Sequence, residues 1–169
     1  MSKRPYNVGE MSVDSWPDVL RIYLDGIASG NATFETEPPT WEHWDRAHLP
    51  FARLVLTIGS VTVGWAALSR VSARAVYSGV AEVSVYVSSE MRGQGLGRTL
   101  LEALVRESEL NGIWTLQASI FPENRPSIRL HQRCGFREVG RRERIAQLGG
   151  IWRDTVLLER RSTIVGTHA

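Results

Sequence analysis

Apolar positions along the chain follow two different spacings, which together predict a sheet covered by helices. Some stretches repeat their apolar residues every three or four positions, as one-sided helices do. Shorter stretches are rich in β-branched and aromatic residues and are bounded by glycine or polar residues, as strands are. The helices are predicted at 13–28, 40–48, 96–110 and 124–133. The strands are predicted at 6–11, 53–58, 61–69, 81–88, 115–121, 136–144 and 151–160.

The order of these elements indicates the fold class. Two antiparallel hairpins are predicted, one around Gly59-Ser60 and one around Gly149-Gly150, with helices and strands mixed between them. This order favours an α+β (mixed α/β) fold over a doubly wound one. The chain of 169 residues suits a single domain without repeat or linker. Its core is expected at about 6–160, and 161–169 is expected to be a mobile tail.

Composition excludes several classes of partner. The net charge is only +2, from 20 Lys+Arg against 18 Asp+Glu, and there is no long basic tract, so no nucleic-acid partner is expected. The chain has one cysteine, Cys134, and therefore no intramolecular disulfide. No apolar run approaches the roughly 20 residues that span a membrane, and the first residues lack the apolar core of a signal peptide. A cytoplasmic protein without a membrane partner is expected.

The run Arg92-Gly93-Gln94-Gly95-Leu96-Gly97-Arg98 lies between a predicted strand and the start of a predicted helix. Backbone N–H groups at such a turn can converge on one anion, where the helix dipole adds about half a positive charge. Glycine permits close approach of a ligand and positive φ. A P-loop is excluded because Arg92 stands five positions before Gly97, and the spacing G-x-G-x-G is not a dinucleotide fingerprint. The run predicts a phosphate site, with a ligand-free glycine-rich helix start as the alternative.

Further residues in the same order give the chain a family resemblance. The strand Val83-Ser84-Val85-Tyr86-Val87 precedes the glycine run, and a pattern N-x-x-S-x-x-L-x-x-x-x-G-F from Asn124 to Phe136 follows it. With these residues the chain resembles the GCN5-related N-acetyltransferase (GNAT) family over roughly 6–159. The resemblance implies a mostly antiparallel twisted sheet with splayed central strands. It also implies transfer of an acetyl group from acetyl-CoA to an amine.

The resemblance implies how the chain would bind acetyl-CoA. Backbone N–H groups of the glycine run would bind the pyrophosphate. Backbone groups of the preceding strand would bond the pantetheine arm and polarise the thioester carbonyl, which gains negative charge in the transition state. The implied cofactor-binding residues are Val85, Tyr86, Val87, Arg92, Gly93, Gln94, Gly95, Leu96, Gly97, Arg98, Asn124 and Ser127. No metal is expected, because no His, Cys, Asp and Glu residues have ligand spacing.

Within the family the chain is most similar to the phosphinothricin and methionine sulfoximine acetyltransferases. The similarity rests on the segments 33–38, 82–87 and 127–131. It implies that Glu82 is the general base for the α-amine of a small glutamate analogue such as phosphinothricin, methionine sulfoximine or sulfone, or arsinothricin. His131 stands where many family members have tyrosine, and it is either the proton donor to the leaving thiolate or a structural histidine.

The acceptor pocket is less well defined by the sequence. The similarity implies that Phe34 and an arginine, Arg74 or Arg70, hold the substrate, with Tyr77 beside them, although Phe34 can equally be a core residue and both arginines can be solvated. The segment 144–148 departs from the subgroup's pattern. The subgroup implies a homodimer. Two alternatives stay open: acetylation of another amine (a peptide N-terminus, a polyamine or an aminoglycoside), and a non-catalytic acyl-CoA sensor.

Overall fold

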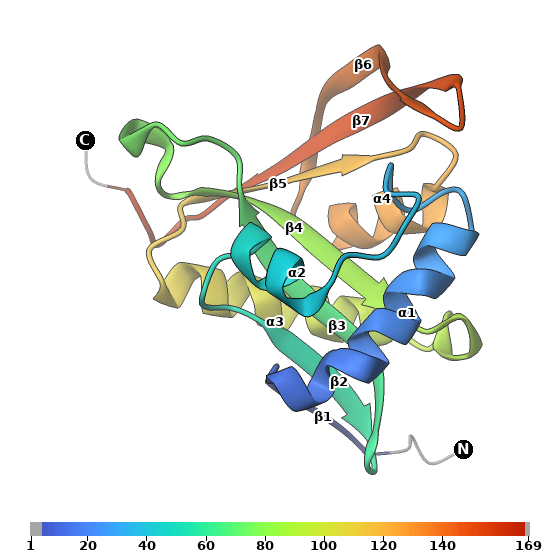
Figure 1. Ribbon diagram of the computed structural model, residues 1–169. Helices are drawn as coiled ribbons and strands as arrows, with labels where there is room; N and C mark the ends of the chain where they lie inside the picture. Colours follow the sequence, from blue (N-terminus) through green and yellow to red (C-terminus); the bar gives the residue numbers. More distant parts are fainter. Residues whose placement is uncertain (1–4, 168–169) are drawn as a thin grey trace.

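A computed structural model describes residues 5–167, which form one seven-stranded sheet with four α-helices (Figure 1). The strand order is β1-β2-β3-β4-β5-β7-β6, and every neighbouring pair is antiparallel except β4 and β5. The strands are β1 (Tyr6–Glu10), β2 (Leu54–Ile58), β3 (Val61–Arg70), β4 (Val80–Val87), β5 (Thr115–Ile120), β6 (Arg137–Leu148) and β7 (Ile151–Arg161). The α-helices are α1 (Trp16–Ala28), α2 (Trp41–Ala47), α3 (Leu96–Leu110) and α4 (Arg125–Arg133). The predicted α+β class is confirmed.

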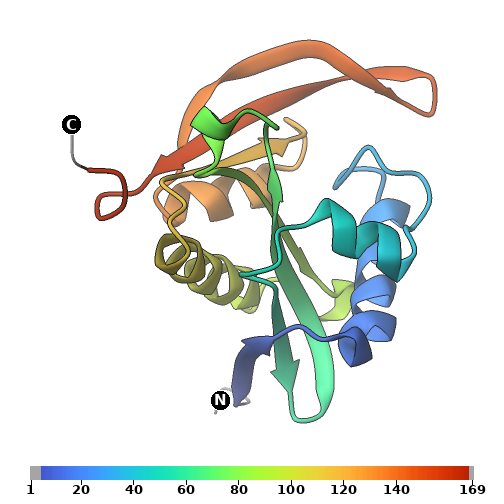
Figure 2. The same cartoon turned by 60° about the vertical axis from the view of Figure 1, so that its left-hand side comes forward.

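Helices cover both faces of the sheet, and the strands alternate to match them. Leu56 and Leu68 face a core built with α3, whereas Val55 and Trp65 face a second core built with α1 and α2. Figure 2 shows α3 on one side of the sheet and α1 and α2 on the other. Because successive strand residues point to opposite faces, this alternation fixes which β4 side chains reach each side.

The predicted helix at 13–28 is wrong in its first turn. Residues Val13–Ser15 form a 3-10 turn, and α1 begins at Trp16. Ser15, which precedes α1, has helical backbone angles and no capping side-chain bond; the Ser12 N–H donates to its hydroxyl instead. Thr40 caps α2, because its Oγ1 accepts from the His43 N–H at 3.3 Å.

The central strands β4 and β5 diverge. They pair in parallel only at 80–82 with 115–117. Beyond Glu82, β4 continues along β3 as far as Val87, while β5 continues along β7 as far as Ile120. The predicted splay of the central strands is therefore confirmed, and it begins at Glu82. Gly64 of β3 lets α3 pack closely against the sheet, since a Cβ at this position would lie 2.8 Å from Leu100 Cδ1.

The strand predicted to end at 144 continues to Leu148. The pairing of β6 with β7 shifts between Arg142 and Ala146, and Arg144 adopts a left-handed φ of 46° within this bulge. Asp154 on β7 stabilises the bulge, because its Oδ1 accepts from the Arg144 N–H at 2.8 Å. A bulge inserts residues without ending a strand, so the irregular segment lies within β6. The other predicted boundaries agree within about two residues, the usual uncertainty at element ends.

The chain after β7 is bonded to the body of the protein as far as it is described. Ser162 is buried, and its hydroxyl donates to Glu109 at 2.9 Å. Mobility of 161–169 stays a prediction.

Within residues 5–167, no helix combines the length and the apolar character needed to cross a membrane.

Candidate active site

A cavity of about 1190 Å³ opens where β4 and β5 diverge. Its walls come from β4, the glycine run, the end of β5, α4, the loop after α1 and the end of α2. Most of the residues predicted for the site line it: Phe34, Glu82, Val85, Tyr86, Val87, Arg92, Gly93, Gly95, Leu96, Gly97, Arg98, Asn124, Ser127 and His131. Residues predicted from segments far apart in the chain thus line one continuous cavity.

The glycine run forms the start of α3 beside this cavity. Gly93 has φ +76° and Gly95 has φ +82°, and neither would meet an atom within 4 Å if it carried a Cβ. Glycine is needed here for the left-handed backbone rather than for space. The first N–H groups of a helix have no partner inside the helix, so the turn can present those at the start of α3 to an anion. Gln94 does not line the cavity; its side-chain amide donates to Met91 Sδ at 3.7 Å.

The open edge of β4 and the Asn124 side chain also contribute to the cavity near the glycine run. Among the described residues, no strand pairs with 83–87 of β4 on the side that faces β5, so its backbone can bond an extended ligand as a neighbouring strand would. The Asn124 side chain caps α4 by accepting from the Ser127 N–H at 3.3 Å. Its amide also donates to the Asn31 carbonyl at 3.1 Å. Asn124 thus joins α4 to the loop after α1.

Arginines gather along the cavity near the glycine run. Arg92 and Arg98 were predicted, and Arg129 and Arg133 of α4 line the same cavity. The Arg98 guanidinium also bonds Glu102, to which its Nε donates at 2.7 Å. Arg129 and Arg133 were not predicted for the site, although their four-residue spacing places them on one helix face. This end of the cavity is suited to a polyanion.

Glu82 lies at the point where the strands separate. It is the last β4 residue that pairs with β5, and its Oε2 accepts from Gln117 Nε2 at 2.7 Å. This hydrogen bond orients the carboxylate within the cavity lining. Gln117 was not predicted, because its link to Glu82 spans 35 positions and leaves no local pattern.

His131 is buried, with 4% of its surface exposed. Its Nδ1 lies 2.8 Å from the Ser127 carbonyl, which can only accept, so Nδ1 carries the hydrogen and Nε2 has the lone pair. Burial lowers the pKa of His131, while the bond to Ser127 raises it less. His131 is therefore neutral at pH 7, and it must take up a proton before it can donate one to a thiolate.

Phe34 is fixed by residues that the sequence analysis did not identify. Its ring packs edge-on against Phe121, with centroids 4.8 Å apart, and the Arg153 guanidinium lies over the other ring at 4.1 Å. Arg153 also donates to Gly30 O at 3.1 Å and to Glu123 at 3.2 Å. β7 thus holds the loop that carries Phe34. Arg153 lies just beyond the divergent segment, and no motif marks it.

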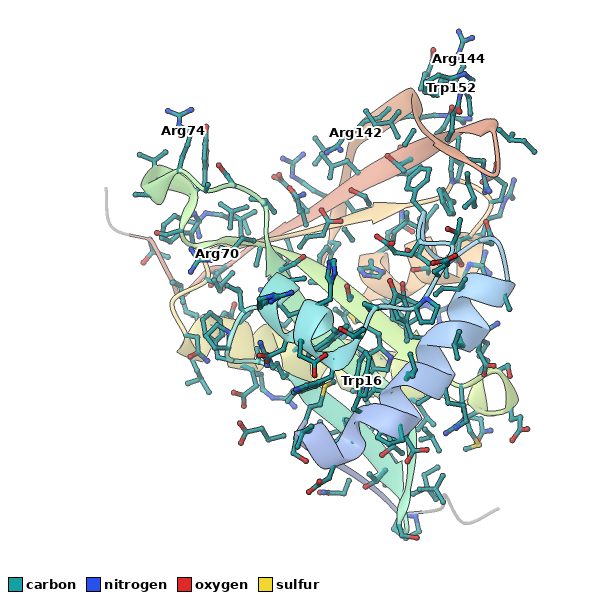
Figure 3. The ribbon with its side chains drawn as sticks, in the orientation of Figure 1. Trp16, Arg70, Arg74, Arg142, Arg144 and Trp152 are labelled. Carbon is teal, nitrogen blue, oxygen red and sulfur yellow. The ribbon has the colours of Figure 1, made fainter. Side chains whose placement is uncertain are left out.

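Arg70, Arg74 and Tyr77 do not line the cavity. All three are exposed, and the Arg74 guanidinium lies over the Tyr77 ring at 5.4 Å. Figure 3 shows Arg74 on the outer connection between β3 and β4, pointing away from the body of the domain. The fold of this chain does not bring these side chains together with Glu82.

Aromatic side chains form the floor of the cavity. Tyr86 stacks on Trp65 with centroids 4.7 Å apart, and a Cβ at Gly26 would lie 2.7 Å from the Tyr86 ring. Burial raises the pKa of the Tyr86 hydroxyl, so it stays protonated. Trp16 and Trp41 extend the cluster under α2. These tryptophans pack inside the domain, whereas Trp152 is exposed.

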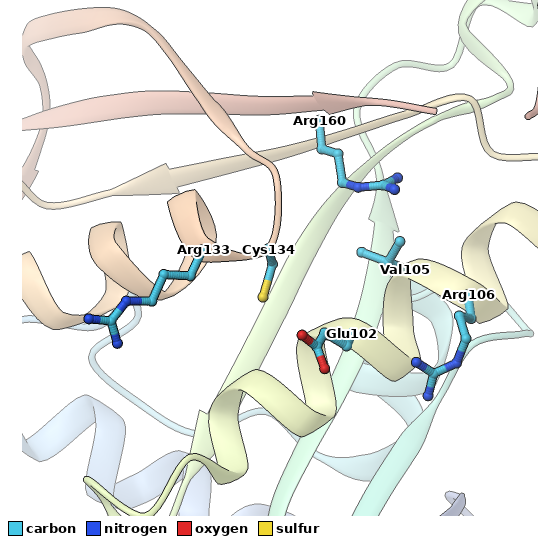
Figure 4. Close-up of a pocket in the computed structure, with 6 residues that line it drawn as sticks. All are labelled: Glu102, Val105, Arg106, Arg133, Cys134 and Arg160. Carbon is cyan, nitrogen blue, oxygen red and sulfur yellow. The ribbon is translucent and has the colours of Figure 1, made fainter. Parts of the chain in front are cut away.

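A smaller pocket of about 290 Å³ lies between α3, α4 and β7 (Figure 4). It holds the Cys134 thiol, whose pKa is raised mainly by burial. A protonated thiol is a poor nucleophile, and Cys134 does not line the larger cavity. In the described part of the chain, no three His, Cys, Asp or Glu side chains are grouped as a metal site.

Comparisons with known proteins agree with this geometry. The profile of the Acetyltransferase (GNAT) family matches residues 16–136. The phosphinothricin N-acetyltransferase of Alcaligenes faecalis is 33% identical over 156 residues, which cover 87% of this chain and 78% of that protein. The L-methionine sulfoximine/L-methionine sulfone acetyltransferase of Pseudomonas aeruginosa is 30% identical over 159 residues, which cover 90% of this chain and 92% of that protein.

A solved structure shows the same fold. A GNAT superfamily phosphinothricin acetyltransferase from Sinorhizobium meliloti, in complex with acetyl-CoA, superposes with a TM-score of 0.88 at 24% identity, over 97% of this chain and 92% of that one. The family profile covers well over half of the chain. The chain belongs to the GNAT family of acetyltransferases.

Proposed function

We propose that this acetyltransferase moves the acetyl group of acetyl-CoA to the α-amine of a small glutamate-analogue amino acid, such as phosphinothricin or methionine sulfoximine. The observation that carries the proposal is the position of Glu82. Its carboxylate lies in the cavity at the point where β4 and β5 separate, next to the backbone available for the thioester. Relatives named for these substrates are 30–33% identical along most of the chain.

The donor side supports acetyl-CoA. The turn at Gly95 and the arginines beside it match the two negative charges of a pyrophosphate. An extended pantetheine arm would run along the open edge of β4 towards Glu82. A backbone N–H of Val85 to Val87 would stabilise the charge that develops on the thioester oxygen. No protein nucleophile is required, because the cavity accommodates both reactants for direct attack.

The acceptor side supplies the proton transfer that the reaction needs. An α-ammonium group is protonated at pH 7 and becomes nucleophilic only after losing a proton. Glu82, oriented by Gln117, takes that proton, and the amine lone pair then forms the C–N bond. The C–S bond then breaks with its electron pair on sulfur. His131, which is neutral at pH 7, would first take up a proton and then pass it to the departing thiolate. Phe34 would pack against the side chain of the amino acid.

A substrate panel tests this assignment. Acetyl-CoA should release thiol rapidly with methionine sulfoximine or phosphinothricin, and slowly with spermidine, an aminoglycoside or an alanine-terminated peptide. The physical reason is that Phe34 suits a small amino-acid side chain, whereas the arginines that line the cavity repel polycations such as spermidine. Turnover of spermidine or the peptide alone would contradict the proposed acceptor. An absence of turnover with every amine, together with tight acetyl-CoA binding, would favour the acyl-CoA sensor.

We also propose a homodimer in which Arg70, Arg74 and Tyr77 reach the cavity of the second subunit. They lie outside their own cavity, on a connection that also exposes Val76. The β6–β7 hairpin exposes Ile151 and Trp152, as Figure 3 shows for the latter. Exposed apolar side chains of this kind are typical of an interface.

The cytoplasmic location expected from the sequence stays a prediction.

Mixing two defective variants tests the shared site. Glu82→Gln and Arg74→Ala should each have low activity at low amine concentration. In a twofold-symmetric dimer the mixed species carries one intact site, so an equimolar refolded mixture should regain about a quarter of the wild-type activity. Each variant refolded alone is the control. A mixture no more active than the average of its components, or a monomer in sedimentation, would contradict the shared site.

A further inference from the structure

Three polar side chains lie in register across the sheet at the acceptor end of the cavity. Glu82 of β4 pairs with Ser69 of β3, and Ser69 forms a bridge with His48, which follows α2. Residues directly opposite one another on antiparallel strands share a face of the sheet. All three residues line the cavity. His48 and Glu82 therefore flank Ser69 on the face where the amine must approach Glu82.

The backbone around His48 is held in place by Arg53. Its guanidinium donates to Leu49 O at 2.6 Å, to Asp45 O at 2.8 Å and to His48 O at 3.0 Å. It also forms an ion pair with the Asp45 carboxylate. One half-buried arginine thus bonds three carbonyls and a carboxylate between 45 and 49. These charge-assisted bonds fix the backbone position of His48. A turn exposed to solvent would not need them, because water would bond its carbonyls.

The His48 ring is fixed as well. It stacks on Trp44 with centroids 4.0 Å apart, and Nδ1 lies 2.7 Å from the Trp44 carbonyl. A carbonyl only accepts, so Nδ1 carries the hydrogen and Nε2 keeps its lone pair. No other hydrogen bond to the ring is present among the described residues. Nε2 is thus an unused proton acceptor on a residue of the cavity wall.

Burial of the ring, more than the charges around it, keeps this acceptor neutral at pH 7. Burial lowers the pKa of His48 most, and Arg53 lowers it further. The bond to the Trp44 carbonyl and the charge of Asp45 raise it less. Glu82 lies next along this register, on the far side of Ser69 from His48.

The reaction itself requires more than one proton acceptor. An ammonium group carries three N–H bonds and the product amide carries one, so two protons leave the nitrogen. Glu82 holds the first when the amine attacks, and it cannot accept the second until it has lost the first. The second leaves from the positively charged nitrogen of the tetrahedral adduct. One proton ends on the thiolate of CoA, and the other passes to water.

We propose that His48 is a catalytic residue that accepts this second proton through Nε2. The proposal rests on the proposed function, because it assumes an ammonium substrate beside Glu82. In the ternary complex the nitrogen lies between the two acceptors, above Ser69. Glu82 takes the proton that precedes attack, and His48 takes the one that follows C–N bond formation. The C–S bond then breaks with its electron pair on sulfur.

Replacement by phenylalanine tests this role. His48→Phe keeps the stack on Trp44 but removes the acceptor, so kcat with methionine sulfoximine at pH 7 should fall about 100-fold. The KM for acetyl-CoA should not change. The deficit should narrow towards pH 9.5, where hydroxide and buffer bases accept the proton. A matched control is His43→Phe on the exposed face of α2, which should leave the profile unchanged.

Chemical rescue separates catalysis from structure. His48→Ala leaves space beside Trp44, and added imidazole should restore at least a tenth of the lost activity, increasing with imidazole concentration. Wild-type activity in His48→Phe at pH 7, or equal losses at every pH without rescue, would overturn the proposal. Glu82→Gln is measured in parallel. If only that variant loses turnover, the proposed function stands and the His48 assignment fails; if no amine is acetylated, the proposed function itself fails.

Discussion

Replacing Glu82 with glutamine is expected to lower kcat by roughly 10²–10⁴-fold, the usual contribution of a general base. The amide has nearly the same shape and can still bond Gln117, whose side chain now donates to Glu82 at 2.7 Å. It cannot take a proton from the ammonium. The binding of acetyl-CoA, measured by calorimetry, should stay within a factor of about two, because the carboxylate has no part in holding the pyrophosphate.

The control for this change is Glu138→Gln on the exposed outer strand β6, which should keep wild-type kcat. Stopped thiol-release assays across pH 6 to 9.5 would show whether Glu82 acts as a base. The loss of kcat in Glu82→Gln should be smallest at high pH, where the amine is already neutral. Wild-type turnover in Glu82→Gln would contradict the role of this carboxylate. A matching loss of acetyl-CoA affinity would show that Glu82 acts on the shape of the cavity.

Replacing Gly95 with valine is expected to raise the Kd for CoA about tenfold or more. Gly95 has φ +82°, a conformation that costs other residues roughly 1–2 kcal/mol, with β-branched side chains at the upper end. If the turn relaxes to negative φ, the N–H groups that follow no longer converge on the pyrophosphate. The open space around Gly95 means that the effect comes from backbone geometry and not from a clash.

Calorimetric titration of CoA into Gly95→Val measures the effect directly. Gly140→Val is the matched control, because Gly140 also has open space around its Cβ position but no positive φ. Dephosphorylated pantetheine should bind both variants equally, since it carries no pyrophosphate. Unchanged CoA affinity in a folded Gly95→Val protein would contradict the phosphate role of the turn.

The donor half of the site could be predicted from the sequence because it is made of contiguous backbone. One run from Arg92 to Arg98 contains the glycines, the helix start and two of the arginines, and the strand before it has a clear apolar pattern. Glycines at fixed spacing report backbone conformation directly. The same local information located α3 at its observed bounds and predicted Asn124 at the start of α4.

The acceptor half could not be predicted in the same way because it is assembled from distant segments. Gln117 meets Glu82 only through the short parallel pairing of β4 with β5. Arg153 reaches back more than 120 positions to hold the loop of Phe34. His48 enters the site through an isolated bridge to Ser69. Periodicity reports which face a residue occupies within its own element, whereas these contacts depend on how elements meet.

The arginines Arg70 and Arg74 show the limit of placing residues by sequence position. They immediately precede the central strand, which suggested that they reach the substrate. The connection instead projects outward, with Arg74 over Tyr77. A substrate role for them depends on a second subunit.

A crystal structure of the ternary complex with CoA and methionine sulfoximine tests the central claim most directly. It should show the pyrophosphate bonded to backbone N–H groups at the start of α3 and the pantetheine along the open edge of β4. The α-amine should lie within about 3.2 Å of a Glu82 oxygen and of His48 Nε2, the reach of a hydrogen bond. A pyrophosphate held away from Gly95, or an amine bound out of reach of Glu82, would contradict it.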